Sequence, residues 1–371
     1  MEIGFDAKRA FYNKSGLGNY SRSTIELLTK FYPSNNYHLF TPSTENSVKF
    51  NIPENVKIIE PKLFLSRTFK SYWRTFRLSK KIREYNLDIY HGLSGELPYN
   101  ANKKSNAKFI VTIHDLIFIR YPELYNSVDK NIYFQKAKYA CEIADIVIAI
   151  SEQTKSDLIN FFGLDESKIE VVYQGCHSNF RAEVDTNTLI EIAGKYNLPE
   201  NYILNVGTIE KRKNSLSVLK AVNEGKIDTV FIIVGGKTEY QDEILKYARD
   251  NKIENKLMIL NDVPFKDLPA IYQQADIFVY PSLFEGFGIP IIEALNSKIP
   301  VITTKGGVFS ETGGFSSKYV EPDNIEKLSD AIISILEDQD LRKKMISEGL
   351  EYASKFNDEK IASNLMNVYL K

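Results

Sequence analysis

Short apolar stretches alternate with longer amphipathic stretches along nearly the whole chain. The short stretches are rich in β-branched and aromatic residues and predict buried strands, while spacings of three or four between apolar residues predict helices. In the first half, the predicted strands are Ile3–Phe5, Tyr37–Thr41, Val56–Ile59, Asp88–His91, Phe109–Ile113, Ile146–Ile150 and Ile169–Val172. The predicted helices of this half are Tyr20–Lys30, Ser71–Tyr85, Ser127–Ala144 and Ser151–Phe162. Such alternation is typical of a parallel α/β sheet.

The pattern pauses at Tyr173–Thr188, where polar residues and Gly175 predict a linker, and then a second series begins. Its predicted strands are Tyr202–Val206, Thr229–Val234, Leu257–Leu260, Ile277–Tyr280, Val301–Thr303 and Lys318–Val320. Its predicted helices are Leu216–Asn223, Tyr240–Asn251, Asp267–Gln274, Pro290–Asn296 and Ile325–Leu336, followed by a helical tail over Leu341–Lys371. We therefore expect an α/β protein of two Rossmann-like domains that face each other across a cleft. The first domain is expected to span residues 1–180 and to regain about 355–371 from the tail, and the second to span 181–354.

Length and composition agree with two domains of an ordinary globular protein. The chain has 371 residues, more than one hydrophobic core usually serves, with 43% apolar and 26% charged residues. A formal net charge of −1 offers no general attraction to nucleic acid. Cys141 and Cys176 stand outside metal-binding or redox spacings, and no apolar run approaches the roughly 18 residues of a membrane span. These features predict a cytoplasmic protein with reduced thiols.

The stretch Tyr280–Ala294 carries the strongest chemical signal. A strand ends at Tyr280, a glycine-containing loop follows, and Pro290 suits the first position of a helix. The backbone amides of residues 287–291 would then form an anion site at the helix N-terminus. The carboxylates of Glu285 and Glu293 would bind sugar or ribose hydroxyls. The alternative is an ordinary strand–loop–helix in which Glu293 only balances the helix dipole.

Glu-x7-Glu with an embedded Gly-Phe-Gly-Ile-Pro strongly resembles the nucleotide-sugar signature of the family 4 retaining glycosyltransferases, which have the GT-B fold. The resemblance covers nearly the whole chain. It implies that Glu285 acts at the transferred sugar as a catalytic residue and that Glu293 binds the ribose of the donor. It also implies donor contacts from Phe287, Gly288 and Ile289, and a reaction that needs neither a metal ion nor a cofactor beyond the nucleotide-sugar.

A second segment, Gly16-Leu17-Gly18-Asn19-Tyr20, follows the opening strand and leads into a helix. It lacks the third glycine of a dinucleotide fingerprint, and Thr41 stands where that fingerprint wants an acid. An oxidoreductase is therefore disfavoured. The resemblance instead implies a loop that closes over the donor phosphates through Gly16, Gly18 and Asn19.

His114 follows a strongly apolar strand in Thr112-Ile113-His114-Asp115. A histidine at the carboxyl end of a strand points towards the ligand-binding edge of the sheet, and Asp115 could orient it. The alternative is a structural histidine. The resemblance places His114 against the transferred sugar as a catalytic residue. We do not expect it to be the base, because the family has no established protein nucleophile and its acceptor is thought to attack directly.

A third segment, Val206–Asn214, again joins a strand to a helix and contains the adjacent cations Arg212 and Lys213. They could neutralise a departing diphosphate, or they could form a solvated basic turn. The resemblance favours the first interpretation and adds Gly207 to the donor site. Many relatives have an arginine directly after this glycine, where this chain has Thr208, so Arg212 carries more of the work.

Several single residues and short motifs give weaker signals. Val263 lies in a post-strand loop that holds the base in relatives, and Ser151 matches a family position but suits an N-cap better. His91 could face the cleft because it ends a strand. Asp338-Gln339-Asp340 spells the metal-binding Asp-x-Asp but lies in a polar helical hinge, and the four histidines lack metal-ligand spacing.

Between Pro61 and Arg83 the chain has basic and aromatic residues but no acid. This segment could rest on anionic lipid, or it could be a solvated helix with aromatics packed on the sheet. The basic residues are Lys62, Arg67, Lys70, Arg74, Arg77, Lys80, Lys81 and Arg83.

The sequence thus predicts a glycosyltransferase that moves a hexosyl group from a nucleotide-sugar to a saccharide or lipid-linked saccharide acceptor. Gly207–Asn214 and Glu311–Gly314 most resemble the mannosyltransferase branch, so GDP-mannose is favoured over a UDP-hexose. The alternatives are a sugar-nucleotide epimerase-like enzyme and a non-catalytic sugar-nucleotide-binding protein of the same architecture.

Overall fold

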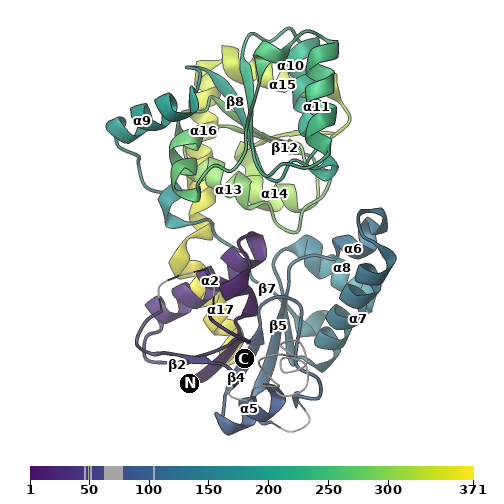
Figure 1. The fold of residues 1–371 in the computed structure, drawn as a ribbon, viewed down its shortest axis with the longest axis vertical. Coiled ribbons are helices and arrows are strands. Elements are labelled where there is room, and N and C mark those ends of the chain that lie inside the picture. The colour runs from purple at the N-terminus through teal and green to yellow at the C-terminus, as the bar shows by residue number, and fades with distance from the viewer. Residues whose placement is uncertain (46, 49, 51, 62–77, 103–104) are drawn as a thin grey trace. The chain divides into compact units, whose positions relative to one another are not determined.

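The computed structural model describes residues 1–45, 47–48, 50, 52–61, 78–102 and 105–371. The chain divides into two compact units, each built on its own sheet (Figure 1). Unit 1 comprises Met1–Gln174 and Asp358–Lys371, and unit 2 comprises Gly175–Asn357. The divisions follow Gln174 and Asn357, where the sequence suggested 180 and 354.

Unit 1 contains a parallel sheet whose described strands have the order β3-β2-β1-β4-β5-β6-β7. Its strands are β1 (Glu2–Asp6), β2 (Asn36–Phe40), β3 (Val56–Ile59), β4 (Ile89–Gly92), β5 (Lys108–Ile113), β6 (Ile146–Ala149) and β7 (Ile169–Val171). Its helices are α1 (Lys8–Tyr12), α2 (Gly16–Phe31), α5 (Leu78–Glu84), α6 (Ile117–Arg120), α7 (Ser127–Ile143), α8 (Glu152–Phe162) and α17 (Asp358–Leu370). Parallel neighbours need crossover connections, so helices cover the faces and the central strands read as apolar runs.

Unit 2 repeats this plan with the described strand order β10-β9-β8-β11-β12-β13, again parallel throughout. Its strands are β8 (Tyr202–Val206), β9 (Val230–Val234), β10 (Leu257–Leu260), β11 (Ile277–Tyr280), β12 (Val301–Thr304) and β13 (Lys318–Val320). Its helices are α9 (Thr186–Tyr196), α10 (Ser215–Glu224), α11 (Tyr240–Asp250), α12 (Leu268–Gln273), α13 (Ile289–Asn296), α14 (Val308–Gly313), α15 (Ile325–Glu337) and α16 (Gln339–Ala353). The prediction of two Rossmann-like domains is confirmed.

The strand order of each sheet shows where loops can hold a ligand. In unit 2 the order reverses between β8 and β11, and in unit 1 between β1 and β4. Ligands of doubly wound sheets bind beyond the carboxyl ends of the strands at such a reversal. In unit 2 this point lies between the loops 207–214 and 281–288, which contain five of the eight donor-binding residues predicted in this unit.

The final helix belongs to unit 1, as the sequence predicted. The Tyr369 hydroxyl on α17 lies 2.7 Å from Nδ1 of His91 on β4, and Thr112 Oγ1 lies 2.8 Å from Nε2 of the same ring. His91 is fully buried, and burial lowers its pKa to about 3, so the ring is neutral. The suggestion that His91 faces a ligand is wrong, because one ring nitrogen bonds Tyr369 on α17 and the other bonds Thr112 on the neighbouring strand β5.

One other prediction differs from the structure, and a second lies partly outside the described residues. The predicted linker hides the start of α9, because the Asp185 side chain accepts a hydrogen bond from the Thr188 amide at 3.0 Å and caps that helix. Of the predicted helix Ser71–Tyr85, residues 71–77 lie outside the described part, which begins at α5 (Leu78–Glu84). Across the described residues, no helix has both the length and the apolar character of a membrane span.

Candidate active site

Glu285 is the centre of a charged cluster in unit 2. Its Oε1 accepts hydrogen bonds from Lys213 Nζ at 2.5 Å and from the Tyr280 hydroxyl at 3.0 Å, and its Oε2 lies 2.9 Å from an Arg212 nitrogen. Arg212 also pairs with Glu210 at 2.6 Å. The loops after β8 and β11 are therefore joined by one carboxylate that holds two cations.

The electrostatics of this cluster follow from its burial. Burial opposes the charge of Glu285, but the attraction of Lys213 and Arg212 outweighs it and lowers the pKa of the carboxyl. Burial likewise opposes both cations, and the attraction of Glu285, together with Tyr280, raises the pKa of each. All three groups are thus ionised at neutral pH, and the Glu210 carboxylate, which also pairs with Arg212, offsets the second positive charge of the cluster.

Backbone geometry holds the two loops together. The Leu283 amide donates to the Arg212 carbonyl at 2.8 Å, and the Arg212 guanidinium donates back to the Phe284 carbonyl. Gly207 ends β8 with a φ of 150°, and the stem of Lys213 would lie 3.6 Å from a Cβ at this position. Glycine suits this position because side chains of other residues rarely allow this φ, and the lysine stem passes it at van der Waals distance.

The helix α13 begins directly beyond this cluster. Its N-cap Gly288 has a φ of 108°, a conformation that favours glycine, and Pro290 lies in the first turn. The first amides of a helix have no intrahelical acceptor, so the amide of Ile289 is available to an anion. The Phe287 side chain is buried edge-on against Phe356, so this residue can reach a ligand only through its backbone.

Glu293 lies one turn further along α13 in a different environment. Its Oε2 accepts a hydrogen bond from the buried Tyr272 hydroxyl at 2.9 Å. Burial raises the pKa of Glu293 to about 7, and the bond from Tyr272 only partly opposes this. The two glutamates of the motif therefore differ, since Glu285 is charged and Glu293 is close to half-protonated at neutral pH.

His114 lies at the carboxyl end of β5 in unit 1. Burial lowers its pKa to about 4, so the ring is neutral at pH 7. Nε2 lies 2.9 Å from the Leu93 carbonyl, which can only accept, so Nε2 carries the proton and Nδ1 is an acceptor. The edge of the Tyr20 ring packs on the imidazole at 4.5 Å between centroids. A neutral histidine with a free acceptor suits a sugar hydroxyl.

The glycine segment of unit 1 is a helix start rather than a loop. Ser15 is extended and its carbonyl accepts from the amides of Gly18 and Asn19 at 3.0 Å, so α2 begins at Gly16 and not at Tyr20. A Cβ on Gly18 would lie 1.8 Å from the Asn13 carbonyl oxygen, so only glycine fits. The amides of Gly16 and Leu17 have no acceptor within the helix and can meet an anion, whereas those of Gly18 and Asn19 already bond Ser15.

The family of the chain follows from sequence comparison. Residues 190–352 match the model of "Glycosyl transferases group 1", and residues 16–180 match that of "Glycosyltransferase Family 4". The chain belongs to the group 1, or family 4, glycosyltransferases. The expectation of a glycosyl-transferring enzyme is confirmed.

Relatives of this glycosyltransferase include the O-antigen chain mannosyltransferase B of Escherichia coli, 26% identical over 100% of this chain and 99% of the relative. The O-antigen chain mannosyltransferase RfbU of Salmonella typhimurium is 32% identical over 60% of this chain and 62% of its own length. The sucrose-phosphate synthase of Thermosynechococcus elongatus has a similar fold, with a TM-score of 0.79 and 20% identity over 100% of this chain and 98% of that one. The predicted GT-B fold class is confirmed.

Sequence reasoning missed the groups of this glycosyltransferase that hydrogen-bond to the predicted site residues. Tyr280 and Tyr272 orient the two glutamates, and the Leu93 carbonyl orients His114. Both tyrosines are buried beside polar groups, and buried tyrosines usually direct their hydroxyl to a partner, but the sequence alone does not identify that partner. The binding roles of all the predicted site residues stay predictions.

The weaker candidates have mixed outcomes. Val263 is partly buried in the loop after β10, next to Asp262, which has a φ of 57°. Ser151 accepts a hydrogen bond from the Thr154 amide at 3.0 Å and is the N-cap of α8, as its position suggested. Asp338 caps α16, so the Asp-x-Asp match is a helix cap. No three His, Cys, Asp or Glu side chains of the described residues are grouped as metal ligands.

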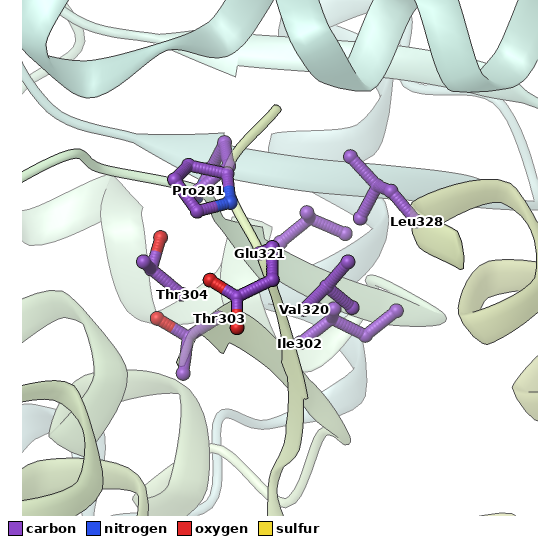
Figure 2. A pocket seen from close by; sticks show the side chains of 9 residues that line it. Pro281, Ile302, Thr303, Thr304, Val320, Glu321 and Leu328 are labelled. Atoms are coloured by element: carbon purple, nitrogen blue, oxygen red, sulfur yellow. The ribbon is translucent and has the colours of Figure 1, made fainter. Parts of the chain in front are cut away.

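Figure 2 shows a small pocket at the carboxyl ends of β11, β12 and β13. Its lining is mostly apolar and consists of Val279, Pro281, Ile302, Thr303, Thr304, Val320, Glu321, Pro322 and Leu328. The residues predicted to bind the donor are absent from this lining. The pocket therefore lies apart from the Glu285 cluster, and a charged diphosphate would find no cation on its walls.

Proposed function

We propose that the chain is a retaining hexosyltransferase that transfers mannose from GDP-mannose to a saccharide or lipid-linked saccharide during synthesis of a cell-surface polysaccharide. The observation that carries this proposal is the Arg212–Lys213–Glu285 cluster beside the N-terminus of α13. The departing nucleoside diphosphate gains negative charge as the glycosidic bond breaks. Fixed cations and helix amides aimed at this charge lower the barrier because they need no reorganisation.

Each predicted residue has a role in this proposal that fits its chemistry. In unit 2, Arg212 and Lys213 neutralise the diphosphate, Glu285 holds both cations in place and accepts from a sugar hydroxyl, and Glu293 binds the ribose. In unit 1, the Nδ1 atom of His114 accepts from a hydroxyl of the transferred sugar. The acceptor attacks on the face from which the diphosphate leaves, as the family resemblance implies for retention.

The choice of donor rests on the relatives. Two of them are named as O-antigen mannosyltransferases, and mannose is therefore the first sugar to test. The proposal requires no metal ion, since Arg212 and Lys213 already supply two positive charges where the diphosphate would lie. Transfer should therefore continue at the same rate after treatment with EDTA.

The decisive experiment measures nucleoside diphosphate release. The full chain is incubated with GDP-mannose or a UDP-hexose and a lipid-linked saccharide extract, and released GDP or UDP is measured together with the anomeric configuration of the product. Lys213→Ala should reduce release by about 100-fold. Lys211→Ala is the matched control, because Lys211 belongs to the same turn but is 70% exposed and pairs with Glu243.

The outcomes separate the alternatives. Release of GDP with an α-linked product supports the proposal, and a β-linked product would contradict retention. Interconversion of sugar-nucleotides without release would indicate an epimerase, and binding without turnover would indicate a binding protein. Equal activity in both lysine variants would contradict the role of the cluster.

We also propose that unit 1 docks on anionic lipid through the basic segment near α5. Most of that segment, residues 62–77, lies outside the described residues, and the support comes from α5 itself. Leu78 and Ile82 are buried there, while the Lys80 side chain is 68% exposed. Flotation with anionic liposomes at low salt tests this, and protein that stays at the bottom of the gradient would contradict it.

A further inference from the structure

Tyr272 on α12 is a buried residue to which the family resemblance gave no role. It is fully buried, and its hydroxyl donates a hydrogen bond to Oε2 of Glu293 on the neighbouring helix α13. A buried hydroxyl needs a partner, and this one is an ionisable carboxyl in the predicted donor site. The contact therefore links the scaffold of unit 2 to a ligand-binding residue.

The direction of this hydroxyl is fixed by the packing of its ring. The Tyr272 ring lies edge-on to Phe180 at 5.3 Å and 84°, and it lies 5.3 Å from the Phe278 ring of β11. Both phenylalanines are themselves fully buried. A ring held between two others has little rotational freedom, so the hydroxyl presents its proton to Glu293 from a set position.

The bond leaves Glu293 with one oxygen for a ligand. Within the described residues, Oε1 accepts no hydrogen bond, and Glu293 as a whole is 8% exposed. The bond to Oε2 restricts rotation of the carboxylate and so limits the directions in which Oε1 can point. Two adjacent ribose hydroxyls match such a carboxylate, because each can donate a hydrogen bond to it.

We propose that Tyr272 is a positioning residue that orients the Glu293 carboxylate and thereby makes the site select ribonucleotide donors over deoxyribonucleotides. The inference rests on the proposed function, since it takes the ligand of Glu293 to be the ribose of a nucleotide-sugar. It goes further in naming the residue and the hydrogen bond on which this selection depends.

Charge supports the same role. Burial raises the pKa of Glu293 to about 7, and the bond from Tyr272 favours the ionised form that accepts most strongly from hydroxyls. The other titratable groups that act on the pair are Tyr280 on β11 and the thiol of Cys176, both through Tyr272. Removal of the Tyr272 hydroxyl should therefore raise the pKa of Glu293 further.

The test compares the affinities of GDP and 2′-deoxy-GDP, and of UDP and 2′-deoxy-UDP, by calorimetry at pH 7.5. The full-length wild type should bind the ribonucleotide of its preferred base about tenfold more tightly than the deoxy form. Tyr272→Phe should reduce this ratio to about twofold, and the deoxy form, which keeps only its 3′ hydroxyl for Glu293, should lose less affinity than the ribonucleotide. Tyr202→Phe is the matched control, because it removes another fully buried hydroxyl, which donates to the Ile271 carbonyl of the same helix.

A second measurement follows the ratio of affinities between pH 6 and 9. Since the deprotonated carboxylate binds best, the ratio should rise with pH, and its midpoint should lie higher in Tyr272→Phe than in wild type. The deoxy form corrects for titration of the phosphates. Melting curves establish that each variant is folded. If Tyr272→Phe does not fold, the pH series on wild type still tests whether Glu293 accepts hydrogen bonds from the ribose.

The outcomes distinguish this inference from the proposed function. An unchanged ratio in Tyr272→Phe, or an equal loss for both forms, would overturn the positioning role while nucleotide binding stands. A pH-independent ratio in wild type would overturn it as well. If wild type binds none of the four nucleotides, the proposed function fails first.

Discussion

Replacement of Glu293 by glutamine should stabilise unit 2 at pH 8 and leave it almost unchanged at pH 5. Burial raises the pKa of Glu293 from 4.5 to about 7. Because the pKa is higher in the folded state than in the unfolded state, the contribution of this group to stability is fully present below about pH 4.5. That contribution is lost as the pH rises through 7. A shift from 4.5 to about 7 corresponds to about 3 kcal/mol at pH 8. Glutamine has no proton to lose and can still accept from Tyr272, so it avoids this cost.

Glu285, the other glutamate of the motif, is a control because its contribution to stability depends on pH in the opposite direction. The pKa of Glu285 is lowered, so its charge stabilises the fold at neutral pH and that contribution is lost as the pH falls. Glu285→Gln would leave Arg212 and Lys213, whose side chains are only 16% and 12% exposed, without the carboxylate that they share. Loss of one partner from such a buried cluster costs about 3 kcal/mol.

The assay is thermal unfolding of wild type and both variants at pH 5, 6, 7 and 8, with differences taken within each pH. For a unit of this size, about 3 kcal/mol corresponds to roughly 6–12 °C. Glu293→Gln should melt higher than wild type at pH 8, and Glu285→Gln should melt lower at pH 7. The same pH dependence in wild type and Glu293→Gln would refute the reasoning, because it would mean that Glu293 does not titrate near 7.

Three further predictions concern other parts of the site and its support. His114→Ala should reduce kcat/KM about 100-fold without changing the melting temperature, as measured by diphosphate release and circular dichroism. Gly288→Ala should cost about 1–2 kcal/mol and weaken GDP binding, because its φ of 108° and the Thr312 hydroxyl at 3.3 Å exclude a Cβ. Tyr369→Phe should leave Nδ1 of His91 without its bond, cost about 1–2 kcal/mol and speed amide exchange in α17 while transfer is retained.

Much of the fold could be predicted because its elements repeat a strong local pattern. Strands such as Phe109–Ile113 are apolar and β-branched, and each is followed by a helical period. The helix α9 was missed because only its cap, Asp185, marks the start, and of its apolar residues only Ile192 is buried while Ile190 is 66% exposed. Sequence periodicity detects burial, so it fails where a helix is mostly solvated.

The sequence predicted which residues belong to the site, but not which of them contact one another. The resemblance named Arg212, Lys213 and Glu285, yet the contact of these residues depends on β8 and β11 being neighbours in the sheet. Strand order is a long-range property that local patterns do not encode. For the same reason the sequence could not tell that His91 faces Tyr369, which lies 278 positions later.

The number of acceptor positions on Glu285 limits what it can do for the sugar. A carboxylate has about four lone-pair positions. Lys213 and Tyr280 occupy two on Oε1, and Arg212 occupies one on Oε2. One position on Oε2 remains, so Glu285 can accept from a single sugar hydroxyl while the cations stay bound. Any second sugar contact would have to displace Lys213, Arg212 or the Tyr280 hydroxyl from the carboxylate.

This limit gives a prediction for substrate analogues. The test uses a series of nucleotide-sugar donors, each of which lacks one hydroxyl of the transferred hexose. Their kcat/KM values are measured by diphosphate release in wild type and in Glu285→Gln. In wild type, each missing hydroxyl that normally contacts the protein should reduce kcat/KM. In Glu285→Gln the size of this reduction should change for only one hydroxyl. Penalties that change for two hydroxyls would mean that Glu285 gives up one of its three present contacts to the sugar during the reaction. Unchanged penalties throughout would assign Glu285 to holding Arg212 and Lys213 alone.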